Sequence, residues 1–323
     1  MKIYPDVEIT KPEKQLRLYG YENHFNFFIK LFNEKKLPNT ILLSGRKGSG
    51  KATFAYHFAN YLLSQYEQNK YSVDTLEISP ESRSYKLVYN NAHPNFFTFN
   101  NSANNGKVKI EHVRNLLNFL NKTVFSMNLR IIIIDNIEYL NVNSSNALLK
   151  ALEEPRGNTF FFIIHNSSTK ILNTIKSRSI TFNFFFNLLE KKEILKNILK
   201  HYDDNFDMHD LDEFLYSDTP GNILKYLLIF GSENKIMHKN KLSSILYLVE
   251  KYKNKNDPEL LSIISSFIEF FYSELSLKNY ANIDNYFINK YKILQQIDDL
   301  KKFNLDKKNF FISLHGILNN ESY

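Results

Sequence analysis

Residues 130–179 read RIIIIDNIEYLNVNSSNALLKALEEPRGNTFFFIIHNSSTKILNTIKSRS and decide the fold. They contain two apolar runs without polar alternation, Ile131–Ile134 and Phe160–Ile164. Such runs are typical of strands in a parallel sheet that is buried on both faces. Between the runs, a helix that Pro155 stops places its alanines and leucines on one face. Strand, crossover helix and strand together predict the centre of a parallel α/β sheet.

Asp135 directly follows the first apolar run. It is therefore expected at the carboxyl edge of the sheet, where open α/β sheets bind their ligands. From this fragment alone two interpretations stay open. Asp135 is either a ligand-binding carboxylate or the polar end of a buried strand.

A second ligand-binding motif lies upstream, where residues 45–51 read GRKGSGK. This is the phosphate-loop pattern of Gly, four residues and Gly-Lys, and it stands between an expected strand, Ile41–Leu43, and an expected helix, Thr53–Leu63. Glycines let backbone N–H groups turn toward a phosphate, and the lysine adds a positive charge. A glycine turn without a ligand is the alternative. The residues expected to bind nucleotide here are Gly45, Gly48, Ser49, Gly50, Lys51, Ala52 and Thr53.

One position departs from this motif. A Ser or Thr normally follows the lysine and places its hydroxyl on Mg²⁺, but here the residue is Ala52. Thr53 lies about 100° further round the helix. The loop therefore predicts phosphate binding more strongly than it predicts Mg²⁺-assisted chemistry.

Composition sets the broad class. The chain has 323 residues, which suggests roughly two domains, or three if one of them is small. Its 43% of hydrophobic residues predicts that it folds throughout. The absence of cysteine excludes disulfides, thiolate metal sites and a cysteine nucleophile. No apolar leader opens the sequence, and no run of about 18 uncharged apolar residues follows. We therefore expect a cytoplasmic protein without membrane contact. The net charge of +7 is only a weak sign of a nucleic-acid partner.

The remaining expected elements follow from apolar spacing, while residues 64–91 show no clear pattern. Before the central stretch they are a helix at Leu16–Phe32, a strand at Asn95–Phe99, a loop at Asn100–Gly106 and a helix at Ile110–Met127. After it they are a helical segment at Leu188–Gly231 with a break at Pro220-Gly221, and amphipathic helices at Leu242–Tyr252, Glu259–Lys278, Ile283–Phe303 and Lys307–Leu318.

Six motifs follow one another in an order and spacing that resembles the bacterial DNA polymerase III clamp-loader subunits, and the delta-prime subunits most of all. The resemblance covers roughly residues 16–186, and NALLKALEEP and TIKSRS are its most specific parts. The motifs are the phosphate loop, HPN at 93–95, KIEHVR at 109–114, IIIID at 131–135, NALLKALEEP at 146–155 and TIKSRS at 174–179.

The resemblance implies an AAA+ protein. Its parts would be a RecA-like α/β nucleotide-binding domain at 1–186, a small helical lid at 187–240 and an all-α collar for oligomerisation at 241–323. Such subunits assemble in a ring that uses ATP to open the sliding clamp and place it on primed DNA. The implied partners are gamma or tau subunits, delta and the clamp, with DNA reached through the assembled complex.

The resemblance also implies a role for Arg178. Ser177, Arg178 and Ser179 match a Ser-Arg-Cys motif whose arginine enters the ATP site of the neighbouring subunit. A guanidinium beside a γ-phosphate neutralises the charge that develops during hydrolysis. A solvated surface arginine is the alternative.

Against the family pattern, three positions argue that this subunit does not hydrolyse ATP. Asn136 replaces the acidic residue that orients the attacking water, and Glu138 stands too far along to substitute for it. Ala52 lacks the Mg²⁺ hydroxyl, and Leu224 stands where an active subunit carries a sensor arginine. Asn166 either senses the γ-phosphate or caps its own loop. The phosphate loop could still hold ATP without turnover.

Related subunits carry a four-cysteine zinc module, which this cysteine-free chain lacks, so we expect no zinc and no other metal site. The leading interpretation is a non-catalytic delta-prime-like subunit. An ATP-hydrolysing gamma/tau-type subunit or another AAA+ ATPase is the second, in which Lys51 and Asp135 suffice for turnover. A module that binds DNA directly is the third, and no basic stripe interleaved with aromatics supports it.

Overall fold

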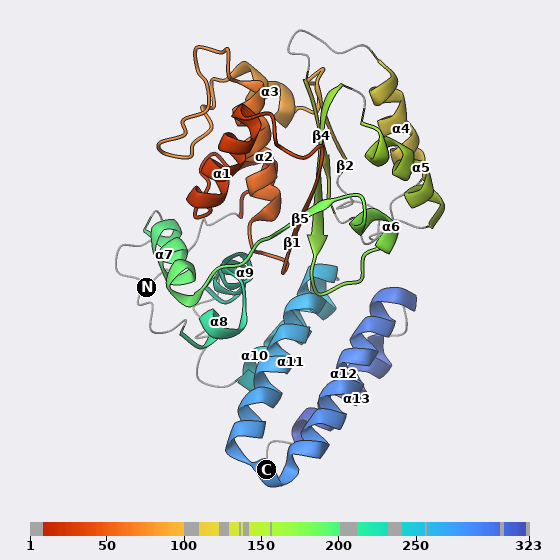
Figure 1. The fold of residues 1–323 in the computed structure, drawn as a ribbon. Helices are drawn as coiled ribbons and strands as arrows, with labels where there is room; N and C mark the ends of the chain where they lie inside the picture. Colours follow the sequence, from red (N-terminus) through yellow and green to blue (C-terminus); the bar gives the residue numbers. More distant parts are fainter. Residues whose placement is uncertain are drawn as a thin grey trace. The chain divides into compact units, whose positions relative to one another are not determined.

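The structure is a computed structural model, and it describes residues 9–99, 110–122, 129–135, 137, 142–155, 157–200, 212–231, 241–255, 257–303 and 307–320. The chain divides into two compact units, Asp6–Lys225 and Tyr226–Tyr323. Each unit is described by itself (Figure 1).

The first unit is built on a parallel sheet in the strand order β2-β3-β4-β1-β5. The two apolar runs of the central stretch are its neighbouring strands β3 and β4, with Ile131 opposite Phe160. β1 lies on the other side of β4, with Gly45 opposite Asn166. The parallel α/β architecture is thus confirmed. The strands are β1 (Thr40–Gly45), β2 (Phe96–Phe99), β3 (Leu129–Ile134), β4 (Asn158–Asn166) and β5 (Ile180–Asn183).

Helices cover both faces of this sheet (Figure 1). Ile131 and Ile133 pack into the core beneath the first group of helices, whereas Ile132 and Ile134 pack into the core beneath the second. All four side chains are fully buried, which is why the strand sequence has no polar alternation. The first group is α1 (Glu22–Asn33), α2 (Lys51–Leu63) and α3 (Arg83–Tyr89), and the second is α4 (Ile110–Asn121), α5 (Val142–Glu153) and α6 (Asn173–Lys176).

The predicted start of the first helix at Leu16 is wrong, because α1 begins at Glu22. The Leu16 carbonyl accepts a hydrogen bond from the Ile78 N–H at 2.8 Å, which keeps this stretch extended. Tyr21 then has a φ of 65°, in the left-handed region, where a right-handed helix cannot continue.

The helix predicted at Ile110–Met127 corresponds to α4, which ends earlier, at Asn121, while residues 123–127 lie outside the described part of the chain. The buried Arg130 donates from Nη1 to the Leu120 carbonyl at 2.7 Å and from Nη2 to the Lys122 carbonyl. These bonds satisfy carbonyls that a helix end leaves without an intrahelical donor.

Two further differences concern helix α2 and the stretch 64–91. α2 begins at Lys51, two residues before the predicted start, so the phosphate loop runs directly into the helix. The stretch without a clear pattern contains α3, which the Ser82 side chain caps by accepting the Tyr85 N–H. The predicted loop 100–106 lies outside the described residues.

The helices after the sheet are nearly where the sequence predicted them. In the second unit, α10 packs on α11, α11 on α12 and α12 on α13. Among the described helices, α11 is long and apolar enough over Glu259–Lys278 to cross a membrane, but half of that stretch is buried, as in a core helix of a soluble protein. These helices are α7 (Leu188–Leu199), α8 (Asp212–Ser217), α9 (Pro220–Gly231), α10 (Lys241–Lys255), α11 (Pro258–Lys278), α12 (Ile283–Phe303) and α13 (Lys307–Asn320), with short 3₁₀ turns at Pro12–Lys14 and Tyr280–Asn282.

Candidate functional site

The phosphate loop lies at the carboxyl end of β1 and leads into α2. Gly48 and Gly50 have φ values of 81° and 82°, in the left-handed region that glycine reaches without strain. Lys51 is 5% exposed, and its ammonium donates to the carbonyls of Gly45 at 2.7 Å and Arg46 at 2.8 Å. The lysine that would meet a phosphate therefore binds its own loop.

Every backbone carbonyl from Gly45 to Gly50 accepts a hydrogen bond. Because a peptide unit is planar, fixing its carbonyl also fixes the direction of the N–H on the same unit. The loop that would bind phosphate through these N–H groups is thus rigidly held. Besides the two bonds from Lys51, the donors are Thr219 Oγ1 to Lys47 (2.8 Å), Gly221 N to Gly48 (3.0 Å), Tyr21 Oη to Ser49 (2.7 Å) and Phe54 N to Gly50 (2.9 Å).

Residues 217–222, which we call the loop-contact segment, supply two of these donors. Arg46 of the phosphate loop in turn donates to the Ser217 carbonyl at 2.6 Å. A Cβ atom on Gly221 would lie only 2.7 Å from the Gly48 carbonyl oxygen, so the two backbones meet where both residues are glycine. From the sequence, Pro220-Gly221 was predicted only as a break in a helical segment, and the contact with Gly48 was not predicted.

Tyr21, which binds the loop, and His165, which lies opposite Ser44 just before the loop, are both uncharged. Burial raises the pKa of the Tyr21 phenol, which keeps it a donor to the Ser49 carbonyl. Burial also lowers the pKa of His165, whose Nδ1 lies 3.3 Å from Ser44 Oγ and whose Nε2 lies 3.0 Å from the Thr169 carbonyl. Neither residue was predicted, since neither belongs to the phosphate-loop pattern.

Asn166 and Asp135 lie at the same carboxyl edge of the sheet as the loop. Asn166 ends β4 opposite Gly45, and its Oδ1 accepts the Ser168 N–H at 3.2 Å, a bond that caps its own loop. Asp135 directly follows β3, one strand further along, and is half-buried. Ala52 and Thr53 lie in the first turn of α2, and Leu224 lies in α9. Asn136 and Glu138 lie outside the described residues.

Arg178 lies at the opposite edge of the sheet. β5 begins at Ile180, which stands opposite Ile41 at the start of β1, whereas the phosphate loop follows the end of β1. A strand of this length spans roughly 16 Å at about 3.3 Å per residue. Arg178 is therefore not brought together with the other predicted site residues.

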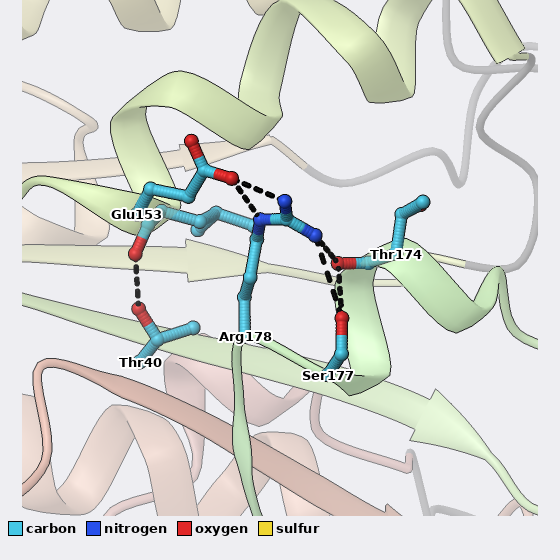
Figure 2. Close-up of polar contacts among 6 residues, drawn as sticks. Thr40, Glu153, Thr174, Ser177 and Arg178 are labelled. Atoms are coloured by element: carbon cyan, nitrogen blue, oxygen red, sulfur yellow. Dashed lines mark hydrogen bonds and ion pairs between the residues drawn. The ribbon is translucent and has the colours of Figure 1, made fainter.

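Arg178 is held by its own chain, as Figure 2 shows. Its Nε and Nη2 groups both bind the carboxylate of Glu153, the last residue of α5. Its Nη1 group donates to the Thr174 carbonyl at 2.9 Å. The Arg178 side chain is 30% exposed. Glu153 and Arg178 lie in the motifs NALLKALEEP and TIKSRS, which are recognisable in the sequence, but the sequence did not predict the contact between them.

Metal ligation finds no support in the described part of the chain, where no group of three or more His, Cys, Asp or Glu side chains is placed to hold an ion. The residue after Lys51 is an alanine, whose side chain has no oxygen to offer Mg²⁺.

A phosphate loop after β1, in a parallel sheet of order β2-β3-β4-β1-β5 with helices on both faces, is an AAA+ fold of the RecA-like class. The DNA polymerase III gamma subunit-related protein of Thermotoga maritima shares this fold, with a TM-score of 0.51 and 17% sequence identity over 92% of this chain and 98% of that one.

Sequence comparison identifies the family more closely. The family model described as "DNA polymerase III, delta subunit" matches residues 20–186, and the chain belongs to this family. DNA polymerase III subunit delta' of Pseudomonas aeruginosa is 32% identical over 139 residues, which are 43% of this chain and 40% of that protein. The delta' subunit of Buchnera aphidicola subsp. Baizongia pistaciae is 27% identical over 235 residues, 71% and 66% of the two chains. The chain thus spans less than two thirds of these relatives' own lengths.

Proposed function

We propose that this protein is a delta-prime-like subunit of a cytoplasmic DNA polymerase III clamp loader, in which it helps to load the sliding clamp onto primed DNA. Its partners would be gamma or tau subunits, delta and the clamp, with DNA reached through the assembled complex. The observation that carries this proposal is the family match over residues 20–186, which covers the whole sheet and its edges.

Within that complex, Arg178 would act on a nucleotide of the neighbouring subunit. The chain's own phosphate loop lies at the far edge of the sheet, roughly 16 Å away along β1. An arginine side chain at the amino edge cannot serve that loop. At the γ-phosphate of a neighbour, its guanidinium would neutralise the charge that develops during hydrolysis.

The phosphate loop would hold a nucleotide without turning it over. Gly48, Gly50 and Lys51 have the backbone conformation and the charge that phosphate binding requires. Lys51 would exchange its bonds with the Gly45 and Arg46 carbonyls for bonds with phosphate oxygens. Ala52 lacks the hydroxyl that ligates Mg²⁺ in the phosphate-loop motif, which favours nucleotide binding over nucleotide hydrolysis.

The chain's regions would then have separate tasks. Residues 1–186 would form the nucleotide-binding α/β domain, residues 187–240 a lid and residues 241–323 a collar that joins the ring. The loop-contact segment supports the assignment of the lid, since it binds the phosphate loop through Thr219 and Gly221. The apolar packing of α10–α13 on one another supports a separate helical collar.

The test begins with the purified chain. We expect no ATP hydrolysis above background, with or without primed DNA, and binding of ATP that Lys51→Ala abolishes. Robust turnover by the chain alone that disappears in Lys51→Ala would instead establish the ATP-hydrolysing alternative. In a complex reconstituted with gamma and delta, Arg178→Ala should lower DNA-dependent hydrolysis and clamp loading.

A further inference from the structure

Glu153 and Arg178 form the contact on which this inference rests. The Nε and Nη2 groups of Arg178 form one edge of the guanidinium, and both bind the same carboxylate oxygen of Glu153 (Figure 2). Guanidinium geometry is rigid and planar, so occupation of one edge fixes the direction of the other. An anion that meets the edge formed by Nη1 and Nη2 would compete there with the Thr174 carbonyl, to which Nη1 donates at 2.9 Å.

The Glu153 side chain comes from a firmly anchored helix end. Leu148 and Leu152 bury the inner face of α5 in the core, with exposures of 0% and 3%. The Thr40 hydroxyl, at the start of β1, donates to the Leu152 carbonyl at 3.3 Å, which ties the last turn of α5 to the sheet. Glu153 therefore presents its carboxylate from a fixed backbone.

The Arg178 backbone is anchored in a similar way. Ile175, three residues earlier, is fully buried in the same core as α5. Its carbonyl accepts the Arg178 N–H at 3.1 Å and the Ser179 hydroxyl at 2.8 Å. The long Arg178 side chain is the flexible part of this corner, and Glu153 is the charged group that restrains it.

We propose that Glu153 is a positioning residue that holds Arg178 ready for the phosphate of a neighbouring subunit, an inference that rests on the proposed function. An arginine that is free to rotate loses much side-chain freedom when it engages a phosphate, whereas one already held loses less. The exposed fractions of the pair, 30% for Arg178 and 44% for Glu153, are those of a surface ion pair, which contributes little to folding. Its effect should therefore appear in function rather than in stability.

The experiment uses the full chain reconstituted with gamma and delta subunits, and measures the rate of ATP-dependent clamp loading together with kcat and KM for ATP. We expect Glu153→Ala to lower the loading rate about tenfold, equivalent to about 1.4 kcal/mol of transition-state stabilisation. KM for ATP should stay near the wild-type value, since the arginine acts in the transition state. Glu153→Gln keeps an oxygen that can accept from Nε and should recover part of the rate.

Two controls separate positioning from a structural role. Glu154→Ala removes the neighbouring exposed carboxylate and should load clamps at the wild-type rate. The melting temperature of the free chain should not change in Glu153→Ala. In an Arg178→Ala background, adding Glu153→Ala should have no further effect, because the two residues act as one unit.

The outcomes distinguish this inference from the proposed function. If Arg178→Ala slows loading but Glu153→Ala does not, the positioning role is wrong and the function stands. Faster loading by Glu153→Ala would mean that Glu153 restrains the arginine from acting, which also overturns the inference. An equal loss in the Arg178→Ala background would show that Glu153 works through another contact. If Arg178→Ala itself loads normally, both the positioning role of Glu153 and the trans role of Arg178 are wrong.

Discussion

The contact between Gly221 and Gly48 offers a sharp test of how the phosphate loop is held. In Gly221→Ala the new Cβ would lie 2.7 Å from the Gly48 carbonyl oxygen and 3.0 Å from the Gly48 Cα atom. Both neighbours are backbone atoms, so they cannot rotate aside. The two chains must separate, and the hydrogen bond from Gly221 N to Gly48 O, now 3.0 Å, must lengthen or break.

The expected loss follows from three contributions. A lost hydrogen bond costs about 1 kcal/mol, and forcing an extra methyl group into a packed contact costs about 1–3 kcal/mol. Alanine offsets roughly 0.4–1 kcal/mol of this by restricting the unfolded chain. The free energy of unfolding of the unit Asp6–Lys225 should therefore fall by about 2 kcal/mol, which lowers its melting temperature by about 4–8 °C for a unit of this size.

Differential scanning calorimetry of the full chain measures this shift, with Gly316→Ala as the matched control. Gly316 is an exposed residue of α13, and a Cβ there would meet nothing within 4 Å. The same chemical change should stabilise that helix by up to about 1 kcal/mol. A melting temperature of Gly221→Ala at or above the wild-type value would refute the contact between the loop-contact segment and the phosphate loop.

Three further predictions concern polar contacts elsewhere in the α/β unit. Burial lowers the pKa of His57 to about 3. As the pH falls below about 6.5, this histidine therefore takes up a proton in the unfolded chain but not in the folded one, and the free energy of unfolding should fall by about 2 kcal/mol between pH 7.5 and 5 on its account. Urea titrations of His57→Gln should show a fall that is smaller by this amount, and a fall equal to that of the wild type would contradict the lowered pKa of His57. Asn187 and Glu190 form a capping box at the start of α7, so Asn187→Ala should cost about 1 kcal/mol in urea unfolding and Asn187→Ser much less; equal losses would argue against the cap. Arg130→Met leaves the buried Leu120 carbonyl without its 2.7 Å donor and should cost about 1–3 kcal/mol; a wild-type melting temperature would contradict this.

The centre of the fold is predictable from sequence because its signals are local. Ile131–Ile134 is apolar on both faces, so only a position between two layers of helices suits it. The phosphate loop is recognisable because its glycines and lysine follow one another along the chain. The amphipathic helices of the second unit are equally visible, since each carries its own apolar face.

The start of α1 and the contacts of the candidate site depend on distant residues. Leu16 is extended because it pairs with Ile78, and no local pattern opposes a helix there. The phosphate loop and Thr219 are 172 positions apart at their hydrogen bond, and short polar side chains such as Thr219 serve many roles. Glu153 belongs to a recognisable motif, but its contact with Arg178 exists only once α5 and α6 pack on the same core.

The central proposal is that this chain completes a neighbour's ATP site through Arg178. The most direct measurement is the rate of ATP-dependent clamp loading by a complex reconstituted from this chain, gamma and delta, with Arg178→Ala compared with Arg83→Ala, an exposed arginine at the start of α3. The proposal predicts at least a tenfold loss for Arg178→Ala and a wild-type rate for Arg83→Ala. Wild-type loading by the Arg178→Ala complex would contradict it.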